Sequence, residues 1–483
     1  MTDQQRGDTV GPGGRAITPN IDRLAEAGVT FTEAYCPSPH CCPSRATFMT
    51  GLYPSRHGVW NNICNDWAHS RGLRPGVRCW SEDLRAAGYR LGYTGKWHVS
   101  TEEGPGDRGF EAPGRMAPDT PNANGSTWGH YGKLAAQADS GPRKEGELKR
   151  PGWGDVQLYG SWKHSDERVL YDEKTADQAK ALIGDFAAGQ DPWCVFAGFV
   201  MPHDTYLVSD KYLDLYRLED IPLPPSYADD MEGKPSLVRR TRRDVWGQLT
   251  EREVRECIRH YLAMCSWLDD LVGELLARLE ETGQADNTVV VFCSDHGDYM
   301  GDHGLFAKGI PCYRGAYHVP AIMRWPAGIA RPGRTVDAFV SLADFAPTFR
   351  ELAGAGADAP ATGHSLVPFL RDEPPTDWRD AVFTQCDGVE LYYTQRSVMT
   401  KDYKLVFNGF DEDELYDLRN DPHEMFNQAR NPDYEPALRE LYGRLWDFAR
   451  KEDDKVPNPY LTVALAPYGP GMNRPANSDT LQL

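Results

Sequence analysis

The chain has 483 residues, and its 71 acidic side chains outnumber 52 Lys and Arg, giving a formal net charge of −19 at pH 7. Nucleic acids and anionic membranes are bound through basic surfaces, so this charge argues against both as the main partner. No stretch reaches the roughly 18 apolar residues of a membrane span, and residues 1–15 lack the apolar core of a signal peptide. We therefore expect a soluble, cytoplasmic protein with one large and one small domain.

Helices and strands alternate along most of the chain. A helix is predicted over residues 21–27 with a short strand after it, and residues 81–97 repeat this order with Gly88 as the helix stop. Helices are also predicted over 172–189 and 254–283, and buried strands over 192–201 and 287–295. Residues 101–170, rich in Gly and Pro, are predicted loops around a pocket. The alternation predicts an α/β fold with a central, mostly parallel sheet flanked by helices.

The C-terminal part has a different pattern. A Pro-, Gly- and Ala-rich stretch at 353–375 marks a boundary near residue 370, beyond which residues 383–408 alternate like antiparallel strands and 437–453 form an amphipathic helix. We predict a large domain over 1–370, a smaller α+β domain with an antiparallel sheet over 371–465, and an extended tail over 466–483. The basic residues from Arg239 to Arg243 and the acidic run from Asp411 to Glu414 are interpreted as solvated surface.

The stretch from Cys41 to Gly51, CCPSRATFMTG, places a cysteine and an arginine at the start of a predicted helix. A helix that begins near Pro43 would aim backbone N–H groups and its positive dipole end at an anion beside Cys41. The structural alternative is a loop that enters a helix with Ser44 near the N-cap and two buried cysteines. Eleven irregularly spaced cysteines do not indicate a disulfide framework, so the Cys41 thiol is predicted to be reduced.

Polar side chains follow three of the predicted strands. Asp295 and His296 lie in SDHGDYMGDHGLFAKG, at the carboxyl end of a predicted strand. Ligands collect at this end of the strands in open α/β sheets. The two residues therefore belong either to a cation site or to a solvated turn. Lys96 and His98 in GYTGKWHV are two residues apart, so on a strand both would face one pocket, or else form an exposed basic edge. His203 follows the strand at 192–201, either as a site residue or as an ordinary loop residue.

These motifs together resemble the type I, formylglycine-dependent sulfatase family of the alkaline phosphatase superfamily. The matching segments are CxPSRxxxxTG at Cys41, GKWH at Lys96, PH at His203 and AKG at Lys308, and the C-terminal ELYDLRNDPHEMFN matches as well. The resemblance covers nearly the whole chain. It implies an alkaline-phosphatase-like α/β sandwich with a smaller C-terminal α+β domain.

The resemblance also implies a modified nucleophile and one metal ion. A formylglycine-generating maturation enzyme would oxidise the cysteine of CxPSR to formylglycine, whose hydrate attacks sulfate esters. One divalent cation is implied; oxygen ligands favour Ca²⁺, whereas a histidine ligand also admits Mn²⁺. The implied cation set consists of Asp3, Gln4, Cys41 as formylglycine, Asp295 and His296.

Roles for the charged residues follow from the same resemblance. Arg45, one helical turn beyond the cysteine, would neutralise the nucleophile and the sulfate. Lys96 would stabilise charge and His98 would act as general base. His203, aided by Lys308, would protonate the leaving alcohol. The expected substrate is a small-molecule or saccharide sulfate ester, and no motif specifies which ester or the oligomeric state.

Two rival functions stay open. Relatives that hydrolyse phosphonate monoesters or phosphodiesters share formylglycine and an Asp, Gln, Asp, His cation set, which Gln4 and His296 match. The second rival is an inactive binding relic, because in the related family an apolar strand precedes TDxQ, whereas here Thr2 follows Met1 directly. We expect such a strand to precede Thr2 in the complete protein, since without it Asp3 would lie on a frayed terminus.

Overall fold

The computed structural model describes residues 1–64, 68–111, 141–150, 154–162, 167–356, 359–388 and 391–470. Part of the predicted loops at 101–170, and the predicted tail from residue 471 onward, lie outside these residues. Among the described helices, none is both long and apolar enough to cross a membrane. All eleven cysteines are free thiols in the structure.

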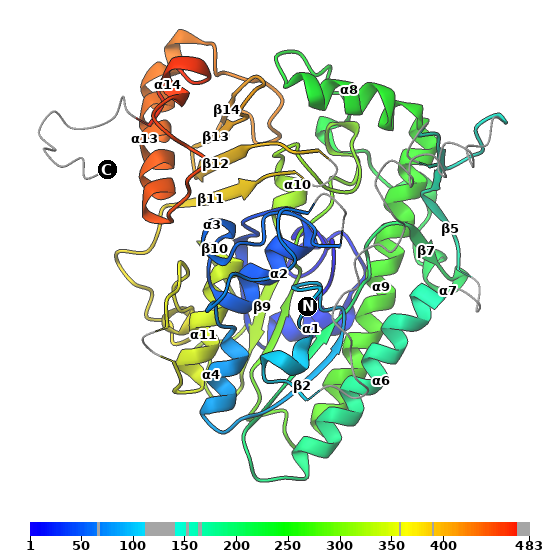
Figure 1. The fold of residues 1–483 in the computed structure, drawn as a ribbon. Coiled ribbons are helices and arrows are strands. Elements are labelled where there is room, and N and C mark those ends of the chain that lie inside the picture. The colour runs from blue at the N-terminus through cyan, green and yellow to red at the C-terminus, as the bar shows by residue number, and fades with distance from the viewer. Residues whose placement is uncertain are drawn as a thin grey trace, which may run out of the picture.

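A large sheet lies at the centre of the molecule (Figure 1). Four strands hydrogen-bond in the order β10-β1-β9-β8, and a second ladder pairs β2 with β6. The β1/β10 and β2/β6 pairs are parallel, whereas β9 is antiparallel to both of its neighbours. The predicted α/β sheet is confirmed, with β9 as its antiparallel strand. The strands are β1 (Val29–Tyr35), β2 (Arg90–Gly95), β6 (Trp193–Gly198), β8 (Val290–Cys293), β9 (Ala321–Arg324) and β10 (Arg334–Ser341).

Helices cover both faces of this sheet. Successive side chains of a strand point to opposite faces, and in β2 the Gly92 position faces Leu182 of α6, whereas Tyr93 packs in the cluster that contains Trp80 of α4. On the first face α6 packs against α9, and on the second face α2, α4 and α11 pack together. The helices are α1 (Pro19–Glu26), α2 (Cys41–Thr50), α4 (Trp80–Ala86), α6 (Glu167–Ala187), α9 (Glu251–Glu281) and α11 (Phe345–Leu352).

Met1 and Thr2 connect the two ladders of the sheet. The Met1 amino group donates to the carbonyl of Ala197 in β6 at 2.9 Å. The Thr2 N–H donates to the carbonyl of Cys293 in β8, also at 2.9 Å. The two residues therefore pair with β6 and β8 at once, and Asp3, which follows them, is fully buried rather than frayed.

A cavity of about 820 Å³ lies between β6 and β8, next to Met1. Residues 193–197 line one side and residues 289–293 the other. Apolar side chains from helices on both faces of the sheet complete the lining, among them Trp80, Ile183 and Leu276. At the carboxyl edge of the central sheet, Met1 and Thr2 bridge β6 and β8 by backbone hydrogen bonds. Away from this edge, the cavity separates β6 from β8.

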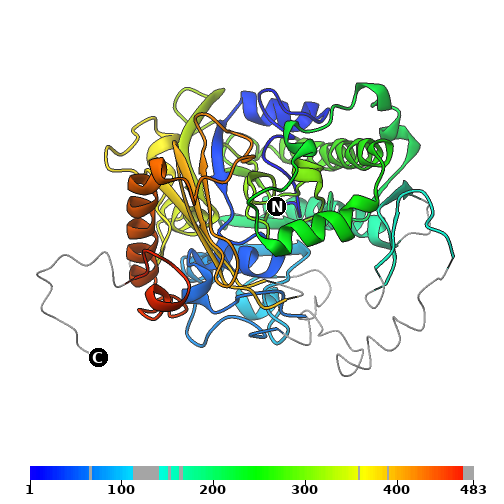
Figure 2. The same cartoon turned by 90° about the horizontal axis from the view of Figure 1, so that it is seen from above.

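The C-terminal part forms its own antiparallel sheet, as predicted, with strands in the order β11-β12-β13-β14. Helix α13 packs on β12 and β13, where Leu405, Phe407 and Trp446 are buried in a separate core. Figure 2 shows α13 on the outer side of this sheet, away from the large one. The elements are β11 (Ala381–Cys386), β12 (Gln395–Thr400), β13 (Tyr403–Phe407), β14 (Glu414–Asp417) and α13 (Glu435–Lys451).

The two charged runs differ in exposure. Arg239, Arg240 and Arg243 are exposed, which confirms their interpretation as surface. Glu414, however, is buried and accepts a hydrogen bond from Asn408 at 2.9 Å, so the acidic run is not entirely solvated and that interpretation is wrong. The remaining short elements are α3 (Pro54–His57), α7 (Asp210–Leu213), α8 (Ser236–Asp244), α10 (Arg314–Tyr317), α12 (Val367–Leu370), α14 (Leu461–Ala464), β3 (Glu147–Leu148), β4 (Val156–Gln157), β5 (Tyr159–Ser161) and β7 (Tyr206–Val208).

Candidate active site

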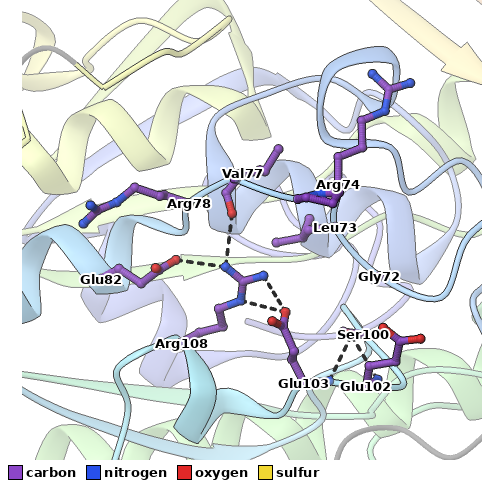
Figure 3. Close-up of a pocket in the computed structure, with 12 residues that line it drawn as sticks. Gly72, Leu73, Arg74, Val77, Arg78, Glu82, Ser100, Glu102, Glu103 and Arg108 are labelled. Atoms are coloured by element: carbon purple, nitrogen blue, oxygen red, sulfur yellow. Dashed lines mark hydrogen bonds and ion pairs between the residues drawn. The ribbon is translucent and has the colours of Figure 1, made fainter.

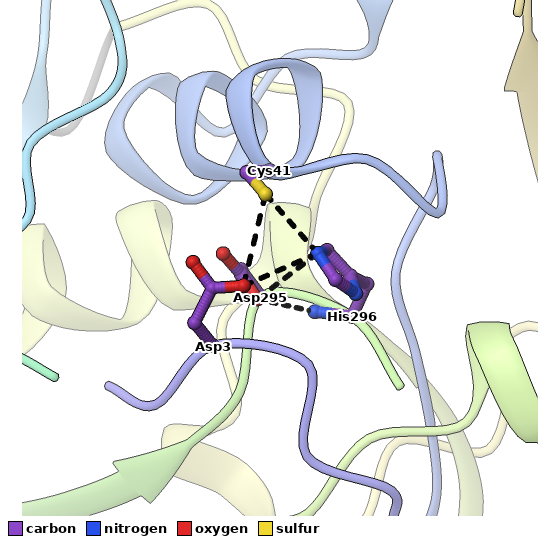
Figure 4. A group of neighbouring side chains, drawn as sticks. All are labelled: Asp3, Cys41, Asp295 and His296. Carbon is purple, nitrogen blue, oxygen red and sulfur yellow. Dashed lines mark hydrogen bonds and ion pairs between the residues drawn. The ribbon is translucent and has the colours of Figure 1, made fainter. Parts of the chain in front are cut away.

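Four of the predicted site residues meet at the carboxyl edge of the large sheet (Figure 4). Asp3 follows the short N-terminal pairing segment, Asp295 and His296 follow β8, and Cys41 is the first residue of α2. All four side chains are buried, and one potential ligand atom of each lies within 4.8 Å of the others. Residues far apart in sequence therefore form one compact group of donors.

The geometry of this group suits a divalent cation. The Nε2 atom of His296 lies 3.4 Å from Oδ1 of Asp3, 3.6 Å from Oδ1 of Asp295 and 3.3 Å from Sγ of Cys41. The Nδ1 atom of His296 lies 2.9 Å from the carbonyl of Gly297 and donates its proton there, which turns the lone pair of Nε2 toward the carboxylates. Two buried carboxyl groups and one imidazole form a donor set that a cation such as Ca²⁺ or Mn²⁺ fits.

Helix α2 places Cys41 at this edge. The helix begins at Cys41 itself, two residues earlier than predicted, with His40 as its N-cap residue. Ser44 is not the cap; its hydroxyl donates to the carbonyl of Asp295 and ties the helix to the end of β8. The sulfur of Cys42 accepts the N–H of Ile63 at 3.5 Å, away from the donor group. The adjacent cysteines thus have different surroundings, and Cys41 alone joins the site.

Two basic side chains balance the buried carboxylates. Arg45 donates to Oδ2 of Asp295 at 2.8 Å and lies 3.4 Å from Oδ2 of Asp3, as expected for a residue one turn along the helix. Lys96 forms an ion pair with the same oxygen of Asp3. Burial opposes ionisation of Asp3, yet Lys96 and Arg45 hold the pKa of this carboxyl below its ordinary range. The carboxyl of Asp3 is therefore kept charged, as cation binding requires.

The Cys41 thiol is affected by the same charges. Burial alone would raise its pKa, but Lys308, Lys96 and His296 bring the pKa of Cys41 well below its ordinary value. Positive charge is therefore gathered around Cys41 in a chain whose net charge is −19.

His203 and Lys308 form a second pair in the site. The Nζ atom of Lys308 lies 2.6 Å from Nε2 of His203, and Nδ1 of His203 lies 2.6 Å from the carbonyl of Asp204, to which it donates. Burial and Lys308 lower the pKa of His203, but Asp204 and Asp3 outweigh them, and the pKa is raised. His203 and Lys308 are therefore hydrogen-bond neighbours in the site.

His98 is placed differently from its prediction. Strand β2 ends at Gly95, so Lys96 and His98 lie in the loop after it. The expectation that both face one pocket because they are two residues apart on a strand is therefore wrong. His98 has a φ of +56°, in the left-handed region, which turns the chain at this position. Its Nδ1 is buried and has no hydrogen-bond partner among the residues that the structure describes. This nitrogen therefore stays unsatisfied, and no contact among the described residues joins His98 to the donor group around Cys41.

Gln4 contacts the site through its side-chain amide. Its Oε1 accepts from Lys308 at 2.7 Å, and its Nε2 donates to Oδ2 of Asp298 at 2.6 Å. The backbone N–H of Gln4 donates to Oδ1 of Asp295 at 3.1 Å. Gln4 is therefore held between the lysine of the predicted site and a buried carboxylate, beside the four donor residues.

Three acidic residues of this region were missed from sequence. Asp172 of α6 accepts the N–H groups of Val200 and Met201 at 2.8 and 2.7 Å and so fixes the turn before His203. Asp204 and Asp298 contact His203 and Gln4 as described above. Asp298 follows His296 by two residues in the same motif, so the sequence offered a signal for it. The sequence offers no such signal for Asp172, because its partners are far along the chain.

A separate hollow of about 370 Å³ lies beside residues 72–78 (Figure 3). Arg108 in its wall pairs with Glu82 at 3.2 Å and with Glu103, so these charges already have protein partners. None of the predicted site residues lines it. We assign this hollow no part in the chemistry.

The fold and site define a hydrolase of the alkaline-phosphatase-like class, and comparison with known families agrees. The model of the family Sulfatase matches residues 1–355, and the model described as N-sulphoglucosamine sulphohydrolase, C-terminal, matches residues 301–451. Because the first match covers well over half of the chain, the chain belongs to the sulfatase family, a family of sulfuric ester hydrolases.

Individual relatives span most of this chain. It is 30% identical over 446 residues to the choline-sulfatase of Rhizobium meliloti, covering 89% of this chain and 82% of that protein. It is 26% identical over 520 residues to the N-acetylglucosamine-6-O-sulfatase of Bacteroides thetaiotaomicron, covering 93% and 85%. The phosphonate monoester hydrolase of Silicibacter pomeroyi has a similar fold, with a TM-score of 0.75, 24% identity and 94% and 95% coverage.

Proposed function

We propose that this chain hydrolyses a sulfate ester to an alcohol and inorganic sulfate after a maturation enzyme has oxidised Cys41 to formylglycine. The observation that carries the proposal is the buried group of Asp3, Cys41, Asp295 and His296 with cationic side chains around it. An acidic protein that gathers positive charge in one buried place is suited to an anionic ester.

The donor set fits one divalent cation, with Ca²⁺ favoured by the oxygen atoms and Mn²⁺ admitted by the imidazole. The residues that would hold it are Asp3, Gln4, Asp295 and His296, with residue 41 beside them. When bound, the cation would polarise a sulfate oxygen as a Lewis acid. Formylglycine would supply a hydrated aldehyde as nucleophile.

The protein's own side chains bind the substrate and move protons. Arg45 and Lys96, held in place by Asp3 and Asp295, would neutralise charge on the sulfate. His203 and Lys308 share a hydrogen bond of 2.6 Å, so a proton on this pair can pass to the departing alcohol oxygen. His98, with an available Nδ1, would act as the base that restores the nucleophile.

The substitution of either adjacent cysteine tests this proposal. We expect C41A to lower turnover of 4-nitrophenyl sulfate by about 10⁴-fold or more, since loss of a covalent nucleophile has effects of that order. C42A is the matched control and should keep most of the activity, because its sulfur bonds the N–H of Ile63 outside the donor group. An equal loss in both variants would overturn the assignment of Cys41.

A phosphonate monoester or phosphodiester hydrolase is the second candidate. It is favoured by Gln4 and His296 at the cation site and by the fold shared with a phosphonate monoester hydrolase. Relative kcat/KM for 4-nitrophenyl sulfate and 4-nitrophenyl phenylphosphonate separates the two. Faster turnover of the phosphonate by fully modified protein would replace the sulfatase proposal.

The inactive relic is the weakest of the three candidates. It assumed that Asp3 would be displaced, but Asp3 is buried within the donor group and pairs with Lys96 and Arg45. Binding of Ca²⁺ by the purified chain would count against the relic, and failure to bind any divalent cation would support it.

A further inference from the structure

The side-chain amide of Gln4 lies between two groups of opposite character. Its Oε1 accepts from the ammonium of Lys308 at 2.7 Å, and its Nε2 donates to Oδ2 of Asp298 at 2.6 Å. An amide has one donor end and one acceptor end. Reversal of the amide would place its oxygen against a carboxylate and its NH₂ group against an ammonium, both unfavourable. The two contacts therefore define a single orientation.

Asp298 is well suited to hold this orientation. Its side chain is fully buried, and its oxygens accept three hydrogen bonds: from Gln4, from the Tyr206 hydroxyl at 2.7 Å and from the Met300 N–H at 2.8 Å. A carboxylate accepts at both oxygens, whereas an asparagine would turn an NH₂ group toward one of these donors. All three hydrogen-bond partners of the Asp298 carboxylate are donors, which an aspartate satisfies and an asparagine does not.

The backbone of Gln4 is fixed without Asp298. Its N–H donates to Oδ1 of Asp295 at 3.1 Å, and its carbonyl accepts from the Tyr261 hydroxyl at 2.7 Å. These bonds hold Gln4 at a φ of +65°. What remains for Asp298 to determine is the direction of the side-chain amide.

We propose that Asp298 is a positioning residue that directs Oε1 of Gln4 into the active site as an oxygen donor. The inference rests on the proposed function, in which Gln4 belongs to the cation set. It also explains the amide at position 4, because a carboxylate there would place two buried like charges in hydrogen-bond contact. Asp298 acts through Gln4 and touches neither substrate nor cation.

The test is titration of Ca²⁺ by isothermal calorimetry into protein with unmodified Cys41, so that no turnover is needed. In D298N, the NH₂ group of the new asparagine would draw Oε1 of Gln4 toward itself and turn the amide around. We expect its Ca²⁺ affinity to fall by about 10- to 100-fold, as is common when a group that orients a metal ligand is lost. The matched control is Y206F, which removes another donor to the same oxygen of Asp298 and should bind Ca²⁺ within about threefold of the wild type.

A compensating exchange strengthens the test. In Q4E/D298N the asparagine NH₂ can donate to one oxygen of the introduced carboxylate and leave its other oxygen facing the site, so Ca²⁺ affinity should recover relative to D298N. Q4E alone should lower the melting temperature of the cation-free protein, and Q4E/D298N should restore it. D298N could fail to fold. In that case, a Q4E/D298N variant that folds and binds Ca²⁺ would support the coupling, and a Q4E/D298N variant that also fails to fold would overturn it.

The outcomes separate this inference from the proposed function. If the wild type binds Ca²⁺ and D298N binds it equally well, the positioning role is wrong while the proposed function stands. If the wild type binds neither Ca²⁺ nor Mn²⁺, both are overturned. Recovery in Q4E/D298N together with loss in D298N would establish that the pair acts as a unit.

Discussion

At the scale of single residues, the site separates groups that hold charge from groups that move protons. Arg45 and Lys96 form ion pairs with the carboxylates of the donor group. His203 and Lys308 contact each other instead, and Nδ1 of His203 donates to the Asp204 carbonyl. This leaves Nε2 of His203 as the nitrogen that can serve a leaving group.

The effect of replacing His203 should depend on the leaving group. In H203N no proton can pass from an imidazole, so poor leaving groups suffer most. We expect kcat/KM to fall by about 10²- to 10⁴-fold for an alkyl sulfate and by much less for 4-nitrophenyl sulfate, whose phenolate leaves without protonation. A plot of log kcat/KM against leaving-group pKa measures this. An equal fall for all esters would show that His203 is not the acid.

At the scale of elements, strand ends and one helix start bring the site together. Thr2, β8 and α2 each deliver their site residues to one edge of the large sheet, which is where ligands collect in open α/β folds. The Thr2 pairing is short, and below it β6 and β8 border the cavity of about 820 Å³ instead of a neighbouring strand. The position of Asp3 therefore depends on a few backbone hydrogen bonds.

The strand expected before Thr2 stays a prediction, and this cavity is where it would pair. A chain extended at Met1 by five or six alternating Val and Ile residues should bury them against the apolar lining and melt about 5 °C higher or more. The control is the same extension with Ser at every position. Differential scanning calorimetry compares the two. Equal melting temperatures would show that the cavity does not accept a strand.

At the scale of the whole molecule, acidic groups buried in the C-terminal domain link stability to pH. Burial raises the pKa of Asp413 to about 7, while hydrogen bonds from Asn408 and Tyr442 oppose the shift. A carboxyl with a raised pKa stabilises the fold while it is protonated, and this contribution is lost as the pH rises through 7. The protein should therefore lose stability as the pH rises from about 4 to about 7, and this loss is complete above pH 7.

The variant D413N should lose less of its stability over this range than the wild type. Asparagine keeps an oxygen for the Asn408 N–H and has no proton to lose. The control E440Q makes the same charge change on the exposed side of α13 and should follow the wild type. Urea unfolding at pH 5.5 and 8 measures the difference. An identical pH dependence in D413N and wild type would contradict the role of Asp413.

Much of this molecule could be predicted from local sequence. The α/β order and the C-terminal sheet follow from periodicity, whereas the meeting of Asp295, His296 and Cys41 was implied by the resemblance of their motifs to the sulfatase family. The left-handed turn at His98 and the burial of Glu414 could not be predicted, since both depend on packing between distant segments. Asp298 was present in a recognised motif, but its partner Gln4 is almost three hundred residues away.

The central claim is that Cys41 becomes the nucleophile by oxidation. Its most direct test is the mass of the tryptic peptide from Leu24 to Arg45, from protein produced together with a formylglycine-generating enzyme. The account predicts a peptide lightened by exchange of one thiol for an aldehyde, with fragment ions that place the change at Cys41 and not at Cys42. An unmodified thiol at Cys41 under these conditions would contradict the claim.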